Sequence, residues 1–332
     1  MNSIPSEGLP LGLGDSGKIV ENLHHLLIAA NFSNLSADAS FSEETAEAIK
    51  SFQKSRHLET TGVCDLHTWL ALVEAGYRLG DRLLYLQSPM LRGDDVAELQ
   101  KQLGTIGFDS GRVDGIFGEN TEQAVRDFQR NAGLPVDAIF GPDSLHMLNR
   151  LGDTVSGQSV AAVREQESLL NRTTNLENRR VILGEIGGLG SVINEFSREL
   201  TSRHLKVETI SHYDVAQHAN LCNTLNADLY LGITSSQTSS KAISFFSNQR
   251  YESPGGASLA SLLYEKFQPT LGSSLEKFGR ADQILRETRM PAVVIRIGPT
   301  SDLIAYAPEL ASAAADAVVK WLTEPYLNEN NS

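Results

Sequence analysis

The sequence predicts a multidomain protein in which two small all-α, three-helix bundles precede an α/β domain with a mainly parallel sheet. Three observations predict this fold class. A gapless internal repeat covers the first half of the chain, which is typical of a duplicated domain. Apolar residues recur at helical spacing within each copy. From residue 179 the pattern changes to short apolar runs that alternate with longer amphipathic stretches, as in α/β proteins.

The composition limits the class of protein and its partners. With 332 residues and 41% hydrophobic content, the chain can form two or three domains that each bury a core. A formal net charge of -13 argues against a nucleic-acid partner, because such partners attract clustered Lys and Arg. No apolar run is long enough for membrane insertion, and no hydrophobic signal block opens the chain. We therefore expect a cytoplasmic protein.

The repeat aligns residues 14–76 with residues 90–152 at a constant offset of 76 positions. In each copy, Gly and Asp separate the periodic stretches, which predicts about three helices per copy. Identical pairs include Gly17 and Gly93, Leu23 and Leu99, Phe41 and Phe117, Thr45 and Thr121, Phe52 and Phe128, and Gln53 and Gln129.

The second copy carries the more regular motif, Asp114-Gly-Ile-Phe-Gly118 followed by a helical pattern. We expect Gly115 and Gly118 to adopt positive φ in a tight turn, and Thr121 or a neighbour to cap the next helix. The motif resembles the type 1 peptidoglycan-binding domain. This resemblance makes a set of residues candidates for ligand binding, although for the aromatic members a place in the core is favoured over contact with a ligand. The set is Asp114, Phe117, Gly118, Thr121, Phe128 and Gln129.

The first copy departs from this motif. It has Ala39-Ser40 and Ser42 where the second copy has Gly115-Ile116 and Gly118. We expect the same fold in both copies, and we expect the second copy to hold whatever affinity for cell-wall fragments remains. Residues 153–178 form the expected linker, with a charged helix at 160–171.

Residues 179–326 are the expected α/β domain. The periodicity predicts strands and helices that alternate along the chain, which favours a mainly parallel sheet. Strands are expected at 181–183, 207–210, 229–233, 243–246 and 292–297, and helices at 192–204, 215–225, 259–267 and 310–321.

Three segments of this domain resemble the zinc-dependent N-acetylmuramoyl-L-alanine amidases: Gly184-Glu-Ile-Gly-Gly188, Gly232-Ile-Thr234 and the run 285–293. The resemblance puts Ile186 and Thr234 in the places of two zinc-binding histidines, and Arg296 in the place of the catalytic glutamate. A guanidinium is permanently protonated and accepts no proton. The resemblance therefore implies an amidase scaffold without a catalytic residue, a metal site or a cofactor.

The sequence offers two alternative sites. A relocated zinc site would have to use His204, His212, Asp214 and His218, but no two of these histidines have the helical i, i+4 spacing that would hold a metal, and we expect solvated surface histidines. A nucleophilic site would have to use Ser235, Ser236 or Ser239. These residues lack the pattern of a nucleophile elbow, so we expect an ordinary loop.

Two peptidoglycan-binding repeats joined to an amidase fold resemble the CwlM-type actinobacterial regulators. The resemblance implies a pseudoenzyme that activates UDP-N-acetylglucosamine enolpyruvyl transferase, the first enzyme of peptidoglycan precursor synthesis. A peptidoglycan fragment or precursor is a possible ligand. Two alternatives stay open: a zinc amidase with relocated ligands, and a plain sensor of peptidoglycan fragments. The zinc content of the purified protein would separate the hydrolase from the other two.

Overall fold

A computed structural model describes residues 8–32, 39–152, 176–225 and 227–324. The chain divides into two compact units, of which the first carries both repeats and the second carries the α/β domain. The expected linker helix at 160–171 lies outside the described residues. Within the described part of the chain, no helix is both long and apolar enough to span a membrane.

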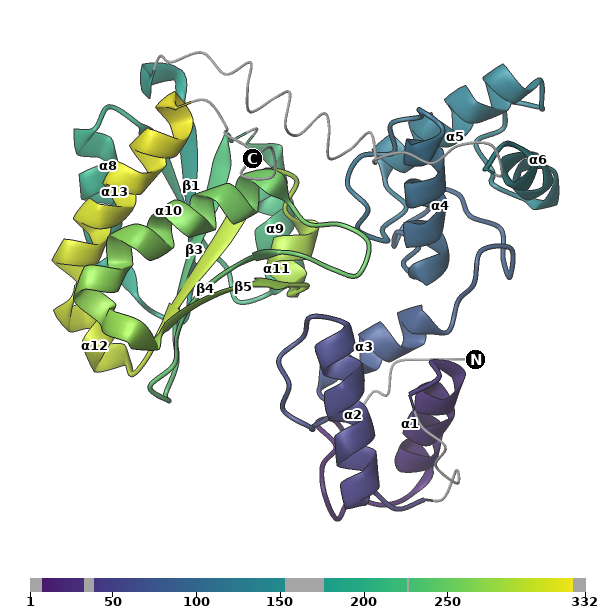
Figure 1. Ribbon diagram of the computed structural model, residues 1–332, viewed down its shortest axis with the longest axis horizontal. Helices are drawn as coiled ribbons and strands as arrows, with labels where there is room; N and C mark the ends of the chain where they lie inside the picture. Colours follow the sequence, from purple (N-terminus) through teal and green to yellow (C-terminus); the bar gives the residue numbers. More distant parts are fainter. Residues whose placement is uncertain (1–7, 33–38, 153–175, 226, 325–332) are drawn as a thin grey trace. The chain divides into compact units, whose positions relative to one another are not determined.

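Each repeat is a bundle of three helices, as predicted (Figure 1). The two bundles have the same aromatic centre: Phe32 and Phe52 meet edge to face at 5.2 Å, and Phe108 and Phe128, at the equivalent positions, meet at 5.7 Å. The first repeat consists of α1 (Lys18–Ala29), α2 (Glu43–Ser55) and α3 (Leu66–Ala75), and the second of α4 (Asp94–Thr105), α5 (Glu119–Ala132) and α6 (Pro142–Gly152).

The two repeats begin their second helices differently. Ser42 caps α2 through a capping box with Thr45, whereas Gly118 precedes α5 without any side-chain cap. Two expectations were therefore wrong. Thr121 does not cap α5, because it lies inside the helix and its hydroxyl binds Gln100, and Gly118 has an extended φ of -100°. Gly115 does adopt the expected positive φ, at 74°. The serine that marks the first copy as divergent thus provides a helix cap.

Replacing Gly118 with serine should therefore stabilise the second repeat. A Cβ at this position meets only the Met90 sulfur, at 4.0 Å, and Thr121 occupies the same helix position as Thr45 of the capping box. The expected gain is about 0.5–1 kcal/mol, from the new cap and from a less flexible unfolded chain. Amide hydrogen exchange of α5 in the whole protein would measure it. Gly115→Ser is the matched control and should destabilise instead, because of its positive φ.

The second unit is a six-stranded sheet with the strand order β2-β1-β3-β6-β4-β5. Strand β4 runs antiparallel to β6, and every other neighbouring pair is parallel, so the predicted mainly parallel sheet is confirmed. The strands are β1 (Arg180–Ile186), β2 (Lys206–Ser211), β3 (Leu229–Ser235), β4 (Lys241–Phe246), β5 (Leu275–Arg280) and β6 (Ala292–Ile297).

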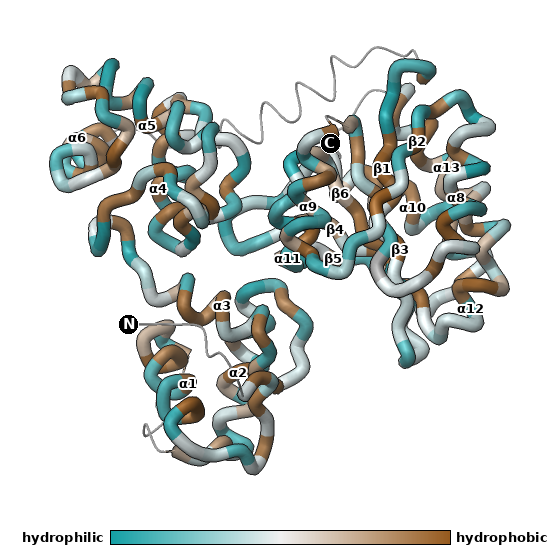
Figure 2. The backbone as a smooth tube through the Cα atoms, turned by 180° about the vertical axis from the view of Figure 1, so that it is seen from behind, coloured by the Kyte–Doolittle hydropathy of each residue, from teal (hydrophilic) through white to brown (hydrophobic). Residues whose placement is uncertain are grey.

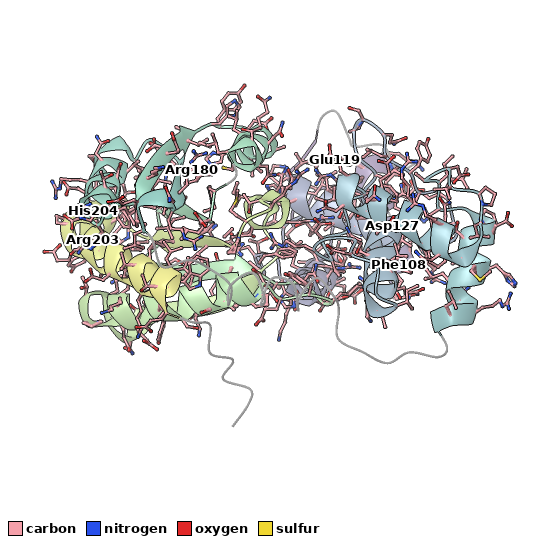
Figure 3. The ribbon with its side chains drawn as sticks, turned by 90° about the horizontal axis from the view of Figure 1, so that it is seen from above. Phe108, Glu119, Asp127, Arg180, Arg203 and His204 are labelled. Carbon is pink, nitrogen blue, oxygen red and sulfur yellow. The ribbon has the colours of Figure 1, made fainter. Side chains whose placement is uncertain are left out.

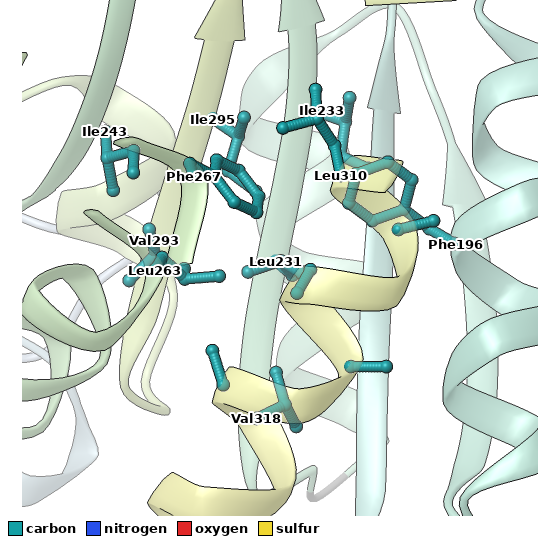
Figure 4. Close-up of a cluster of buried hydrophobic side chains, with 14 of the residues drawn as sticks. Phe196, Leu231, Ile233, Ile243, Leu263, Phe267, Val293, Ile295, Leu310 and Val318 are labelled. Atoms are coloured by element: carbon teal, nitrogen blue, oxygen red, sulfur yellow. The ribbon is translucent and has the colours of Figure 1, made fainter. Parts of the chain in front are cut away.

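Helices cover both faces of the sheet. Three long helices, α8 (Gly190–Ser202), α10 (Pro254–Leu271) and α13 (Ala307–Thr323), pack with the strands to form the main core. Figure 4 shows this core around Leu231, Ile295 and Phe267. Two shorter helices, α9 (Val215–Thr224) and α11 (Gln283–Glu287), contact each other and lie on the opposite face. Figure 2 shows that strand β6 is strongly hydrophobic, as expected for a strand covered on both sides.

Three elements of this unit were not predicted: β5, α11 and α12 (Thr300–Ala305). Strand β5 reads Leu-Glu-Lys-Phe-Gly-Arg and lies at the edge of the sheet beside β4, with Glu276 and Lys277 exposed to solvent. The two helices have five and six residues, too few to show a helical period in the sequence.

Candidate functional site

The carboxyl ends of β1, β3 and β6 form the candidate site. In the strand register Ile186 is the partner of Thr234, and Thr234 is the partner of Arg296. Because side chains alternate between the two faces of a sheet, these positions share one face, the face covered by α9 and α11. The structure therefore brings together the three positions at which the amidase resemblance places the zinc histidines and the catalytic glutamate.

The residue types in this row do not fit a zinc ion. Zinc in proteins binds imidazole nitrogen, thiolate sulfur or carboxylate oxygen, and isoleucine, threonine and arginine supply none of these. Thr234 is half-buried, and its hydroxyl makes only a long contact of 3.5 Å with the Ser235 carbonyl oxygen. Glu185, the nearest carboxylate in sequence, is the register partner of Ile233 and belongs to the opposite face. Among the described residues, no three His, Cys, Asp or Glu side chains form a group that could hold a metal.

The residues considered for a relocated zinc site have other roles. The Asp214 carboxylate caps α9 by accepting a hydrogen bond from the Gln217 backbone N–H. His212 stacks on Tyr213 with ring centroids 5.0 Å apart. His204 is exposed just after α8, beside Arg203, which joins α8 to α13 through Asp316 (Figure 3).

His218 contradicts the expectation of a solvated histidine, because it is fully buried on α9. Its Nε2 lies 3.2 Å from the hydroxyl of Tyr230 on β3. Burial lowers the pKa of His218 and raises the pKa of Tyr230, since each charged form loses its hydration. Two glycines make room for the tyrosine ring: a Cβ at Gly184 would lie 2.0 Å from the Tyr230 hydroxyl, and one at Gly232 would lie 3.0 Å from its ring. This buried pair lies on the same sheet face as Thr234.

The serine-rich segment after β3 is a structural loop. Ser236 and Thr238 share a hydrogen bond between their hydroxyls at 2.8 Å, and the Ser240 carbonyl oxygen accepts the Gly298 backbone N–H at 2.7 Å. The loop lies so close to β6 that a Cβ at Gly298 would be 2.1 Å from the Thr238 carbonyl oxygen. These contacts hold the loop against the strand that carries Arg296.

In the second repeat, two of the candidate ligand-binding residues, Asp114 and Thr121, contact a buried glutamine that was not predicted from the sequence. The Gln100 amide oxygen accepts the backbone N–H groups of Asp114 and Gly115, at 3.1 and 2.8 Å. Its amide nitrogen donates to the Asp114 carboxylate at 2.9 Å, the Ile116 carbonyl at 3.1 Å and the Thr121 hydroxyl at 3.1 Å. Gln100 is only 1% exposed. One side chain therefore holds the whole turn against the bundle.

Gln129 holds the next turn in the same way. Its amide accepts the Ala138 N–H and donates to Asp137, the Ile139 carbonyl and Ser144. Gln53 makes the equivalent contacts in the first repeat, but His24 stands where the second repeat has Gln100 and binds the Thr45 hydroxyl at 3.0 Å. The 76-residue offset aligns His24 with Gln100, and this alignment of two polar residues is the sequence feature that could have indicated their shared role.

Most of the candidate ligand-binding residues are therefore internal. Phe117 and Phe128 are fully buried in the core of the repeat, as their core interpretation predicts. Thr121 and Gln129 are buried in the glutamine contacts. Only Asp114 and Gly118 are partly exposed. A ligand of this repeat would meet the turn at its edge rather than these rings.

Comparison with known families supports this description of the repeats. The family described as "Putative peptidoglycan binding domain" matches residues 16–72 and 92–148. The matched segments begin shortly before α1 and α4 and cover the three helices of each bundle almost completely. Both repeats are therefore peptidoglycan-binding-type domains in sequence.

Individual relatives extend the similarity to the second unit. The chain is 33% identical to the N-acetylmuramoyl-L-alanine amidase CwlM of Mycobacterium tuberculosis over 290 residues, 78% of this chain and 71% of that protein. It is 33% identical to the amidase CwlL of Bacillus licheniformis over 45% of this chain and 48% of that protein. The amidase Ami1 of Mycobacterium abscessus aligns in structure with 44% of this chain and 97% of its own, at a TM-score of 0.35 and 12% identity. On its identity to CwlM across most of both chains, this chain belongs to the CwlM-type N-acetylmuramoyl-L-alanine amidase family.

Proposed function

We propose that this chain is a catalytically inactive amidase homologue that acts in the cytoplasm as a regulator of peptidoglycan precursor synthesis. One observation carries the proposal. The backbone register joins Ile186, Thr234 and Arg296 in a single row at the carboxyl ends of three adjacent strands. A metal-dependent hydrolase needs zinc ligands and a proton acceptor at such a place, and these three residue types supply neither.

The partner in this proposal is UDP-N-acetylglucosamine enolpyruvyl transferase, which the resemblance to CwlM-type regulators implies. Two features of the chain support binding to a protein or a small ligand: the peptidoglycan-binding-type repeats and the absence of a strongly basic charge balance. A peptidoglycan fragment or precursor would bind the second repeat, whose Asp114 and Gly118 lie at the accessible edge of the turn.

The zinc content of the purified protein tests the proposal. We expect no stoichiometric zinc, because a divalent ion next to a guanidinium at about 5 Å is repelled by roughly 6–7 kcal/mol at an effective dielectric constant of about 20. Metal analysis of protein purified without chelators would measure the zinc. The variant Arg296→Glu is the second arm, and it should cleave no muropeptide, since a base without a metal-bound water has nothing to activate. One tightly held zinc per chain, or turnover by the variant, would refute the proposal.

The second candidate function is amidase activity. The relatives CwlM and CwlL both carry the name N-acetylmuramoyl-L-alanine amidase, which favours it. Under this candidate the wild-type protein would hold zinc at another place and release the peptide from a muropeptide. The same metal analysis, combined with a muropeptide cleavage assay, distinguishes the two candidates.

A further inference from the structure

Helix α9 packs on β2 and makes a polar contact with β3 through His218. His218 projects from the middle of α9, is 0% exposed, and meets Tyr230 of β3 edge to face with ring centroids 5.8 Å apart. The distance between His218 Nε2 and the Tyr230 hydroxyl is 3.2 Å. Tyr230 is also fully buried, and its ring lies over Gly184 and Gly232. The contact therefore connects α9 to β3, and through the tyrosine ring to the neighbouring strand β1.

The burial of His218 makes this contact sensitive to charge. Nδ1 is buried and makes no hydrogen bond of ordinary geometry within the described part of the chain, although the His212 backbone acts on the ring as an acceptor that raises its pKa. The loss of hydration outweighs this acceptor, because burial is the largest cause and lowers the pKa overall. A buried imidazolium is therefore disfavoured. Protonation would work against the buried position of the ring.

The groups around His218 do not offset a positive charge. Besides burial, only the backbone and side chain of His212 act on its pKa, and burial, which lowers the pKa, is the largest cause. The carboxylate of Glu208 is exposed on β2, and that of Glu287 is half-buried on α11. The titratable and charged groups of the elements packed here are Tyr230 on β3, Cys222 on α9, His212 and Asp214 before α9, Lys206 and Glu208 on β2, Arg180 and Glu185 on β1, and Arg286 and Glu287 on α11.

We propose that His218 is an acid-sensitive latch: the neutral ring holds α9 on the sheet through Tyr230, and the protonated ring releases α9. Helix α9 lies over β2 and over Tyr230 of β3, on the sheet face to which Thr234 and Arg296 belong, so its release would expose that part of the face. The latch is independent of the proposed regulatory function, since it rests on the packing of α9 alone.

The direction of the pH dependence follows from the burial. An unfolded histidine has a pKa of 6.5, and the pKa of buried His218 lies below it. The released state therefore binds the proton more strongly than the latched state. The latch is complete above pH 6.5 and weakens as the pH falls below that value, until the pKa of the buried ring is reached.

Hydrogen exchange of the whole protein between pH 7.5 and pH 5.5 tests the latch. After correction for the intrinsic exchange rate, opening of α9 should rise by up to about tenfold per pH unit below 6.5, while α13 of the same unit changes much less. His218→Gln keeps a polar group opposite Tyr230 but cannot titrate, so it should abolish the rise. His204→Gln removes an exposed histidine, and the rise in the opening of α9 should remain. Asp214→Asn retains the cap of α9 without its charge, and the rise should remain in this variant as well.

Three outcomes would overturn the latch. The first is a wild-type protein in which α9 opens no more than α13 on acidification, a result that needs no variant to fold. The second is a rise of wild-type size in His218→Gln. The third is loss of the rise in Asp214→Asn, which would assign the pH dependence to the helix cap.

Discussion

Replacing Gly184 with alanine is expected to destabilise the α/β domain by about 3 kcal/mol or more, at the upper end of the usual cost of overpacking a core. The added Cβ would lie 2.0 Å from the Tyr230 hydroxyl oxygen and 2.4 Å from the carbon that bears it. Tyr230 cannot easily adopt another rotamer, because its side chain is fully buried and hydrogen-bonded to His218. Urea unfolding in a Trp69→Phe background would measure the loss, since Trp321 then reports this domain alone.

Gly190→Ala is the matched control for this prediction. Gly190 is the first residue of α8, and a Cβ there would meet nothing within 4 Å. The variant should be as stable as the wild type or slightly more stable, because alanine favours a helix over glycine. If Gly184→Ala unfolded at the same urea concentration as the wild type, Tyr230 would not be fixed as the structure shows, and the latch at His218 would lose its rigid partner.

Replacing Gln100 with leucine is expected to cost about 3–5 kcal/mol in the second repeat, because several buried groups would lose their partners together. Leucine is similar in size but makes no hydrogen bond. The backbone N–H groups of Asp114 and Gly115 would lose their acceptor, and the Thr121 hydroxyl and the Ile116 carbonyl would lose their donor. Hydrogen exchange of α5 in the whole protein would report the loss without separating the repeat from the chain.

Gln102→Leu tests whether the loss of stability in Gln100→Leu comes from the buried hydrogen bonds. Gln102 lies on the same helix, and its side chain binds only Glu98 of that helix, at 2.8 Å. Its replacement should change stability by no more than about 0.5 kcal/mol, as for other surface positions. Equal losses in both variants would mean that α4 is sensitive to apolar substitution in general, and the buried-glutamine explanation would be wrong.

The helices of the repeats could be predicted because their information is local. Apolar spacing and the 76-residue offset are properties of neighbouring residues, and they identified three helices per copy without any contact being known. Burial of a polar side chain has no such signature. Gln100 and His24 occupy helix positions that also suit exposed residues, so only the packed bundle shows that they hold the turns. The same limit applies to Thr121, which was expected at a helix cap and lies inside instead.

The sheet shows a similar division. The five strands with apolar runs were predicted. Strand β5 was not, because an edge strand needs few hydrophobic residues on the side that faces solvent. The prediction of a positive φ at Gly118 was also wrong, since glycine permits positive φ but does not require it. His218 was expected in solvent, because α9 has no strong apolar stripe that would place one of its faces inside.

The amino-acid pattern is enough to show which residues stand at the candidate site and that the first half of the chain is a duplication. Isoleucine, threonine and arginine at positions 186, 234 and 296 exclude zinc-ligand chemistry at those positions whatever the fold. The folded domain is needed to show that these positions form one row and that His218 is buried against Tyr230. The reason is physical: strand register and helix docking depend on contacts between residues far apart in the chain, and no local pattern encodes them.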